Sequence, residues 1–275
     1  MVELAAEQVE LLEGGALTVE QAIDNLHHSD LSLRYYAAWW LGKFQVRDPV
    51  AVSALIAALE DEDDRTELGG YPLRRNAARA LGKLGDYSAI PALIRCLDCS
   101  DFYVREAAAQ SLGTLGDPAG IEPLITLLSG DSTVAQPMPG TPHLVQPCEA
   151  IVEALGALNA VAAIDLIRPF LEHSVPRLQY AAARALYQLT REPVYGDRLV
   201  QALQGDDLQL RRVALSDLGA IGYLPAAAAI AQAATENSFK LFALKGLLEH
   251  EVRSTDSPVP SEAAIRVMHL MDDLL

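Results

Sequence analysis

The side chains best suited to acid–base chemistry belong to an acidic run within the segment 60–71. Carboxylates in such a position can supply or hold a proton, or accept N–H bonds from a ligand. The same run is typical of a solvated turn, and it could also bind a basic patch of a partner protein. The sequence therefore leaves the catalytic residues unknown, and the candidates are Asp61, Asp63, Asp64, Glu106 and Tyr71.

The thiols and imidazoles form no recognisable catalytic or metal-binding motif. Cys96 and Cys99 have C-x-x-C spacing, but no second cysteine pair or nearby histidine completes a zinc site. Cys148 stands alone beside a loop, where a functional thiol is the alternative to a structural one. His27 and His28 are adjacent, so they lie on different faces of a helix. We expect no bound metal and no cofactor.

A repeated pattern indicates which elements carry these side chains. Residues 34–42 have the form R-x-x-A-A-x-x-L-G, and the pattern starts again at Arg74, Arg105 and Arg211. Looser copies start at Cys148, Gln179 and Lys240. Offsets 0, +3, +4 and +7 follow one stripe of an α-helix, and the small residues at +3 and +4 let a neighbouring helix approach closely. The pattern therefore predicts a series of helices that pack on one another.

A second apolar segment follows most copies of the pattern, so each repeat is predicted to be a helix pair. The predicted second helices cover 49–59, 88–97, 119–128, 160–171 and 225–233. Each pair buries its apolar stripe only by stacking on the next pair. The chain is therefore predicted to be all-α, a right-handed α-solenoid (α-α superhelix) of HEAT-like helix pairs without strands.

The sequence predicts a single domain over 1–275. Its parts are an N-terminal cap (1–28), repeats (29–253) with insertions at 60–71 and 129–146, a linker (254–260) and a C-terminal helix (261–275). A capping box at Thr18 begins the first helix, and Ser261 caps the last. The last helix either closes the end of the solenoid or docks a partner through its apolar side, formed by Ile265, Met268, Met271 and Leu275.

The positions one and five residues after each pattern start lie off the buried stripe, and we call them the motif row. They should line the concave side of the solenoid, where the helix that bears the motif usually lies. Aromatic, basic and acidic side chains follow one another there, a set that could stack a flat conjugated molecule, bind its carboxylates and accept its N–H bonds. The predicted ligand-binding residues are Tyr35, Trp39, Arg75, Asn76, Arg79, Glu106, Glu149 and Tyr180.

A structural role is the alternative for several of these residues. Trp39 could pack against the N-terminal cap, and Arg79 could simply pair with Glu106 in the next repeat. The arginines that start the pattern are expected to form a structural ladder with acidic residues of the turns, such as Asp30, Asp101 and Asp207.

The charge balance argues against two classes of partner. Lysine and arginine number 21 against 37 aspartates and glutamates, a formal net charge of −16. Such a field repels phosphate backbones and anionic lipid. No apolar run approaches the roughly 20 residues of a membrane span. We therefore expect no nucleic-acid partner and no membrane partner, and the three cysteines, too few for a disulfide framework, fit a cytoplasmic location.

The repeat unit also resembles a known family. Its core A-A-x-x-L-G-x-L-G-D, seen at 77–86, resembles the HEAT-like repeats of phycobilisome lyases. The segment 33–42 (LRYYAAWWLG) and the acidic loop that runs into Tyr71-Pro-Leu-Arg-Arg-Asn76 are similar to the E-type subunits of the heterodimeric bilin lyases. The phycocyanin and phycoerythrocyanin lyases of this family both stay open as matches.

The resemblance implies an enzyme subunit with defined partners. It would bind phycocyanobilin as a substrate, pair with an F-type lyase subunit, and attach the pigment by a thioether bond to a cysteine of the apo-phycocyanin α subunit. The nucleophile would then belong to the acceptor protein, and the resemblance carries over no established catalytic residue. Two alternatives are a non-catalytic HEAT scaffold or adaptor that binds a protein partner, and a bilin-removing HEAT protein associated with phycobilisomes.

Overall fold

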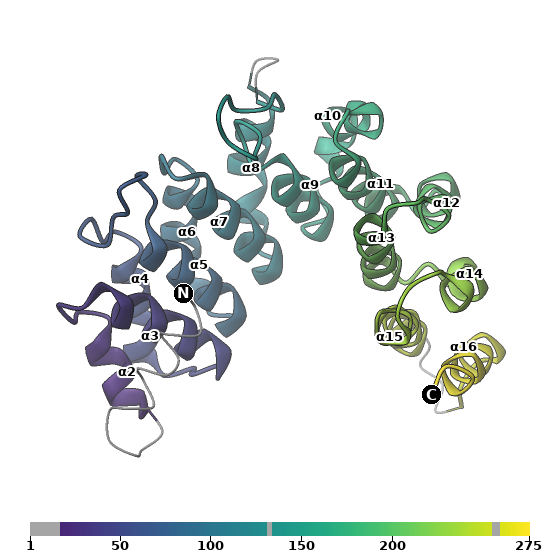
Figure 1. Ribbon diagram of the computed structural model, residues 1–275, viewed down its shortest axis with the longest axis horizontal. Helices are drawn as coiled ribbons and strands as arrows, with labels where there is room; N and C mark the ends of the chain where they lie inside the picture. The colour runs from purple at the N-terminus through teal and green to yellow at the C-terminus, as the bar shows by residue number, and fades with distance from the viewer. Residues whose placement is uncertain (1–16, 131–133, 255–258) are drawn as a thin grey trace. The chain divides into compact units, whose positions relative to one another are not determined.

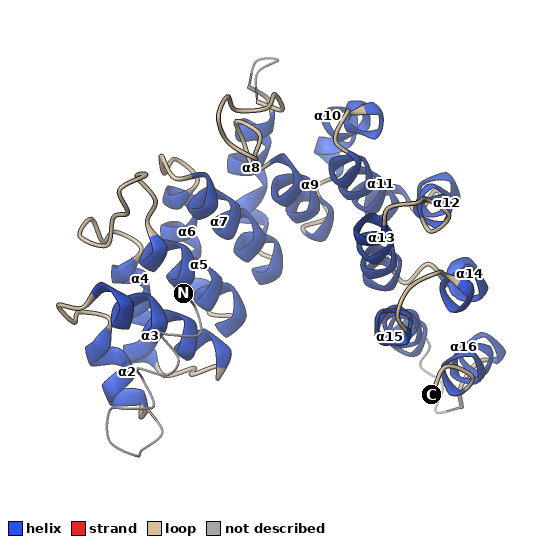
Figure 2. Ribbon diagram, in the orientation of Figure 1, coloured by secondary structure: helices blue, strands red, loops and turns tan. Residues whose placement is uncertain are grey.

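The computed structural model describes residues 17–130, 134–254 and 259–275, and the regular structure in these ranges is helical (Figures 1 and 2). The α-helices are α2 (Val19–Asn25), α3 (Leu31–Lys43), α4 (Pro49–Ala58), α5 (Pro72–Leu84), α6 (Ile90–Cys96), α7 (Phe102–Leu115), α8 (Ile121–Leu128), α9 (Cys148–Ala157), α10 (Ile164–Ile167), α11 (Pro176–Thr190), α12 (Pro193–Ala202), α13 (Leu208–Ile221), α14 (Ala227–Gln232), α15 (Asn237–Ser254) and α16 (Glu262–Asp272). Within the described ranges no strand occurs, and an isolated bridge joins Pro137 to Leu144 in the second insertion. The predicted all-α solenoid class is confirmed.

Contacts divide the chain into two compact units, Met1–Ala154 and Leu155–Leu275, with the boundary inside α9. In the first unit the motif-bearing helices α3, α5 and α7 pack on one another in order, and α4 and α6 pack against α5 and α7 (Figure 1). In the second unit α11 packs on α13 and α13 on α15, with α12, α14 and α16 against them. The second unit has its own core, which includes Leu199, Leu215, Leu218 and Leu244.

The glycine that closes the pattern is required by this stacking. A methyl group added at Gly82 would lie 2.9 Å from the Cα atom of Ser111 on the next motif helix. One added at Gly42 would lie 2.7 Å from the Cα atom of Ala80. The hydroxyl of Ser111, buried in this contact, donates to the carbonyl of Ala78 at 2.8 Å. The helices therefore approach until backbone meets backbone, as the small residues of the pattern predicted.

The residue that starts the pattern does form a ladder, but not with the acids that the sequence suggested. The side chain of Arg34 donates to the carbonyl of His28, that of Arg105 to Cys99, and that of Arg211 to Gly205, each at 2.6 Å. Gln179 makes the same bond, to the carbonyl of His173 at 2.6 Å. Each donor reaches a carbonyl six residues earlier, in the turn that closes the previous repeat, where helical carbonyls lack partners.

The acids have a different role in these turns. The carboxylates of Asp30, Asp101 and Asp207 accept the backbone N–H two residues ahead, at 2.7–2.8 Å, and so cap α3, α7 and α13. The expected pairing of arginine with these three acids is therefore wrong. A carboxylate placed just before a helix is closer to the free N–H groups of that helix than to a side chain on its second turn.

Most second helices begin less regularly than predicted. A short 3₁₀ turn precedes the α-helix in four of the predicted segments, 88–97, 119–128, 160–171 and 225–233. These turns are η1 (Tyr87–Ala89), η2 (Pro118–Gly120), η3 (Val161–Ala163) and η5 (Leu224–Ala226). Another 3₁₀ element, η4 (Arg168–Glu172), follows α10. Helix α12 lies outside the predicted set. It follows the copy at Gln179, in which Tyr187 stands where most copies have the closing glycine, so the signal that marked the next helix was absent.

The caps predicted for the two terminal helices are confirmed, whereas the side of the last helix that was predicted to be apolar is not the side that is buried. Thr18 forms the predicted capping box with Gln21 at the start of α2, and Ser261 caps α16 by accepting the N–H of Ala264 at 3.0 Å. The apolar side predicted for α16 is largely exposed, with Ile265 at 40% and Leu275 at 93%. Ala264 and Val267 are buried instead, because α16 meets α15 and α14 through its small and β-branched residues.

Candidate functional site

The acidic run of the first insertion holds the loop and the start of α5 together. Asp64 is 5% exposed, and its carboxylate accepts the backbone N–H of Leu73 at 2.8 Å. Asp61 accepts the N–H of Asp64 at 2.8 Å and forms an ion pair with Arg34, also at 2.8 Å. Burial raises the pKa of Asp64, against the opposing effect of the hydrogen bond from Leu73. Both carboxylates therefore have structural partners.

Tyr71 and Arg74 form a second layer of the same loop. The Arg74 guanidinium lies 4.3 Å from the centroid of the buried Tyr71 ring and pairs with Glu62. The hydroxyl of Tyr71 donates to Glu62 at 3.2 Å. Hydrogen bonding to Arg74 and its charge hold the pKa of Glu62 below its usual value. Asp63 differs, because its side chain is 79% exposed and lies 3.7 Å from Arg34.

On α3 the motif row presents aromatic rings. Trp39 is 43% exposed and its ring lies 5.4 Å from that of Tyr36, so it is not enclosed by the N-terminal cap in the described residues. Tyr35 is half-buried, and its carbonyl accepts a bond from the side-chain amide of Asn76 at 3.0 Å. Asn76 thus ties α5 to α3, which places the aromatic and basic parts of the row on neighbouring helices.

Arg75 is the arginine of the motif row with the fewest polar contacts in the described residues. Within the described residues its guanidinium forms no ion pair or hydrogen bond, and its Nε atom is buried without an acceptor. Its contact with an aromatic ring is to Tyr103 on α7, with 5.9 Å between Cζ and the ring centroid. The charge of Arg75 also acts on the buried carboxylate of Asp64, whose pKa it lowers. In a chain with a formal charge of −16, a half-buried arginine that forms no ion pair or hydrogen bond is a candidate site for an external anion.

The remaining predicted ligand-binding residues lie in different surroundings. Arg79 pairs with Glu106 at 3.5 Å, as the structural alternative expected. Glu149 is half-buried on α9. Tyr180 lies on α11 in the second unit, where it packs against that unit's core and burial raises its pKa. The contacts of the first unit bring together Tyr35 and Asn76, and Arg79 and Glu106, on three successive motif helices. The roles of all these residues in binding stay predictions.

Sequence reasoning missed an aromatic group beside Arg75. The ring of His143, from the second insertion, stacks on Phe102 with 4.0 Å between centroids and 9° between planes. Tyr103 meets His143 edge to face at 5.8 Å and is 40% exposed. Neither Tyr103 nor His143 falls on the motif row. In the sequence, their position could be suspected only from the insertion that follows the next helix, α8.

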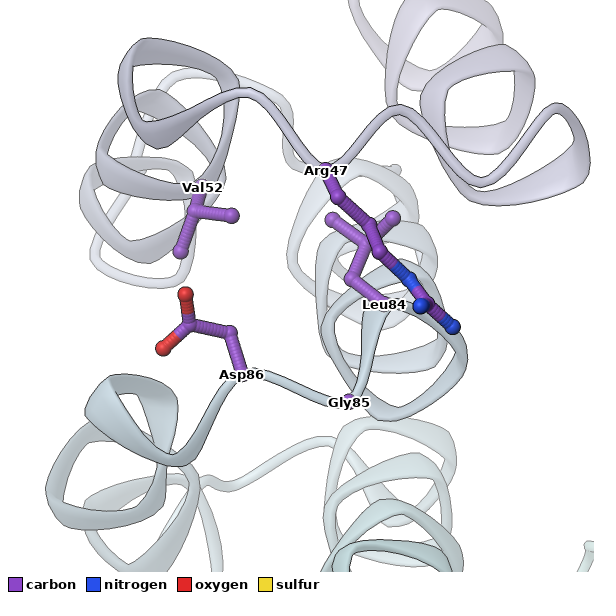
Figure 3. A pocket seen from close by; sticks show the side chains of 5 residues that line it. All are labelled: Arg47, Val52, Leu84, Gly85 and Asp86. Atoms are coloured by element: carbon purple, nitrogen blue, oxygen red, sulfur yellow. The ribbon is translucent and has the colours of Figure 1, made fainter.

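Two pockets lie elsewhere on the described surface. One of about 260 Å³ lies where α5 ends, lined by Arg47, Val52, Leu84, Gly85 and Asp86 (Figure 3). In it Val52 faces Asp86, whose carboxylate is already used to accept the N–H of Ser88 at 2.9 Å. The other, of about 250 Å³, lies in the second unit beside Arg212 and Ser216, and Arg212 is neutralised by Glu236.

Two of the three cysteines are too buried to act as nucleophiles. Cys96 and Cys148 are buried, and burial raises the pKa of each thiol to about 12. In the described residues no group of histidine, cysteine and acidic side chains could hold a metal ion. No described helix is long and apolar enough to cross a membrane.

We therefore predict that a thiol reagent at neutral pH labels native Cys99 quickly and leaves Cys96 and Cys148 almost unlabelled. A thiol with a pKa of about 12 is about 10⁻⁵ ionised at pH 7, and only the thiolate reacts. Mass spectrometry of labelled peptides measures this, with protein in denaturant as the control in which all three react. Rapid labelling of native Cys148 would restore the alternative of a functional thiol.

Family models match the repeats found here. The model of HEAT repeats matches residues 71–136 and 148–219, and that of the PBS lyase HEAT-like repeat matches residues 33–61. The second match covers the segment 33–42 that carried the resemblance, and it runs into the acidic run.

Several curated proteins are similar over the whole chain. The "Phycocyanobilin lyase subunit alpha" of Nostoc sp. is 65% identical, covering 100% of both chains. The protein of the same name from Thermosynechococcus vestitus is 62% identical over 94% of this chain and 95% of its own. The "Bilin biosynthesis protein PecE" of Mastigocladus laminosus is 47% identical over 85% and 82%.

A solved structure agrees with these sequence relatives. A chain in the structure of the complex of CpcE and CpcF of phycocyanin lyase from Nostoc sp. superimposes with a TM-score of 0.88 at 67% identity, covering 96% of this chain and 97% of that one. The resemblance noted in the sequence is thereby confirmed along the full length. This chain belongs to the family of E-type, or alpha, subunits of phycocyanobilin lyases, which are built from HEAT-like repeats.

Proposed function

We propose that this chain is the E-type subunit of a phycocyanobilin lyase, which binds phycocyanobilin and attaches it through a thioether bond to a cysteine of the phycocyanin α subunit. The observation that carries the proposal is the 65% identity to a phycocyanobilin lyase alpha subunit across 100% of both chains. The lower identity, 47%, to the bilin biosynthesis protein PecE favours the phycocyanobilin lyase alpha subunits as the model for this chain.

The proposed chemistry rests on orientation of the pigment. The thiol that forms the bond belongs to the acceptor protein, which suits a chain whose buried cysteines have a pKa of about 12. Holding the bilin in one conformation beside the correct thiol converts an unselective addition into a directed one. The guanidinium of Arg75, which forms no ion pair or hydrogen bond among the described residues, supports binding of a pigment carboxylate at α5.

The proposal includes a heterodimer with an F-type lyase subunit. It is supported by the solved complex of CpcE and CpcF, whose similar chain covers 96% of this one. The exposed apolar side chains of α16, Ile265 and Met268, are a surface that a partner would cover. The apolar N-terminal segment 2–12, also considered for this role, lies outside the described residues. A cytoplasmic location is part of the proposal and suits the unpaired state of all three cysteines.

The test is pigment transfer in a reconstituted system. This chain, an F-type subunit, the apo-phycocyanin α subunit and phycocyanobilin are co-expressed, and covalent pigment on the α subunit is detected by zinc fluorescence on a denaturing gel. Omission of either lyase subunit is the control, and sedimentation of the two subunits should show a 1:1 species. An α subunit that stays colourless beside a stable complex would favour the scaffold alternative, whereas loss of pigment from a preformed holo-subunit would favour the bilin-removing one.

A further inference from the structure

The second insertion is fastened to the start of α7 rather than free of it. Arg105 donates to the side chain of Gln146 at 3.0 Å and to the carbonyl of Val145 at 2.9 Å, while its Nη1 atom holds the carbonyl of Cys99. The stack of His143 on Phe102 adds a second anchor on the same turn of α7. The loop therefore has a defined path, and that path sets where the ring of His143 lies.

His143 is held by its own loop as well. Its Nδ1 atom lies 2.9 Å from the carbonyl oxygen of Leu144, and since a carbonyl only accepts, Nδ1 carries the proton of this bond. The ring is therefore oriented by a hydrogen bond on one edge and by Phe102 on its face. It meets Tyr103 edge to face at 5.8 Å. This packing limits the rotamers open to the Tyr103 side chain.

The ring of Tyr103 in turn lies next to the guanidinium of Arg75, at 5.9 Å. The hydroxyl of Tyr103 makes no hydrogen bond within the described residues, and Arg75 makes none either. A phenolic donor and a half-buried guanidinium, each without a hydrogen bond, therefore lie on adjacent helices, and both are groups that bind carboxylates. The carboxylate of Glu106, also on α7, forms its ion pair with Arg79 at 3.5 Å.

We propose that Arg75 and Tyr103 form a binding subsite for one carboxylate of the pigment, and that His143 of the second insertion is a positioning residue that holds Tyr103 in place. This inference rests on the proposed function, because it takes the ligand to be a bilin, which carries two propionate groups. It gives the second insertion a role in selecting a carboxylate-bearing ligand.

The test compares phycocyanobilin with its dimethyl ester, which keeps the conjugated rings but lacks both negative charges. Binding of each to the complex of this chain with its F-type partner is measured by absorbance titration. The parent complex should bind the free acid at least about tenfold more tightly than the ester, and Arg75→Gln should remove most of that preference. Tyr103→Phe, which removes one hydroxyl, should weaken acid binding about threefold or more and leave ester binding unchanged.

His143 is tested by the contrast between two substitutions. His143→Phe keeps a ring to stack on Phe102 and should retain the preference for the acid, whereas His143→Ala should lose it to the same degree as Tyr103→Phe. Tyr87→Phe and His27→Phe, at exposed positions of the same unit, are the matched controls. Melting temperatures of all variants identify any that are unfolded. If Arg75→Gln is unfolded, Arg75→Lys replaces it in the test, because lysine retains the charge but lacks the planar fork of two N–H donors.

The outcomes separate the inference from the function on which it rests. Equal affinity of the parent complex for acid and ester would overturn the carboxylate subsite and leave the lyase function standing. An acid preference that survives Arg75→Gln and Tyr103→Phe would place the carboxylate elsewhere. Equal losses from His143→Phe and His143→Ala would overturn the positioning role. A parent complex that binds neither compound would sink the proposed function together with the subsite.

Discussion

Replacing Arg75 and Arg79 together by alanine should lower pigment transfer at least about tenfold, because a single charge-assisted hydrogen bond to a carboxylate contributes about 1.5–3 kcal/mol. The two residues lie one turn apart on α5, so they project from the same face of the helix. The melting temperature should stay within a few degrees of the parent value. Arg75 has no ion pair to lose in the described residues, and the Arg79–Glu106 pair, with both side chains partly exposed, contributes under about 1 kcal/mol.

The measurement is the initial rate of covalent pigment attachment to the apo-phycocyanin α subunit, with a thermal melt of the same preparations. A matched control is the pair Lys83→Ala and Arg95→Ala, which removes two positive charges from the same unit without changing the motif row. Arg95 pairs with Glu60 on the surface, where both side chains are 60% exposed. Equal transfer by the parent and the Arg75/Arg79 variant would mean that the pigment binds elsewhere, and that this part of the row is only a solvated face.

Gly82→Ala should lower the free energy of unfolding by about 3 kcal/mol, although alanine is the better helix former by about 1 kcal/mol at an exposed site. The added Cβ would lie 2.5 Å from Oγ, 2.7 Å from Cβ and 2.9 Å from Cα of Ser111. The Cα atom belongs to the backbone of α7 and cannot rotate away, so α5 and α7 must move apart. Every apolar contact between these two helices is then weakened.

Urea unfolding followed by far-UV circular dichroism measures this effect. Gly85→Ala is the matched control in the same region, because Gly85 has φ 74° and open space around its Cβ position. Its cost is only the left-handed backbone strain of about 1–2 kcal/mol. In the Gly82→Ala background, Ser111→Gly should recover part of the loss by removing the clashing side-chain atoms. A Gly82→Ala variant no less stable than Gly85→Ala would show that the helices are not in backbone contact.

Much of the helical framework could be predicted from the sequence because its signals are local. The stripe at +3, +4 and +7 repeats within each helix, so α3, α5, α7 and α13 could be placed without knowing their neighbours. The caps at Thr18 and Ser261 depend on residues three positions away. The segment that runs into Tyr71-Pro-Leu-Arg-Arg-Asn76 carried the family resemblance, which the full-length relatives confirm.

Errors arose where a side chain had a choice of partners. Arg34, Arg105 and Arg211 bind turn carbonyls rather than the capping aspartates Asp30, Asp101 and Asp207. Every residue has a carbonyl, so no residue type marks this acceptor in the sequence. On α16, Ala264 and Val267 are buried in place of the predicted apolar side, because the buried face depends on where α15 and α14 meet the helix.

The sequence by itself determined that this protein is a chain of stacked helix pairs, because periodicity and glycine positions are properties of neighbouring residues. It also determined that aromatic, basic and acidic side chains follow one another along the motif row. The family followed from the resemblance of the segment 33–42 and of the acidic loop to bilin lyase subunits. Only the tertiary structure decided that Asp61, Asp64 and Tyr71 serve the loop that starts α5, and that Arg75 has no such partner among the described residues. The tertiary structure also decided that His143 contacts Phe102 and Tyr103, because the path of an inserted loop depends on the helices to which it is anchored.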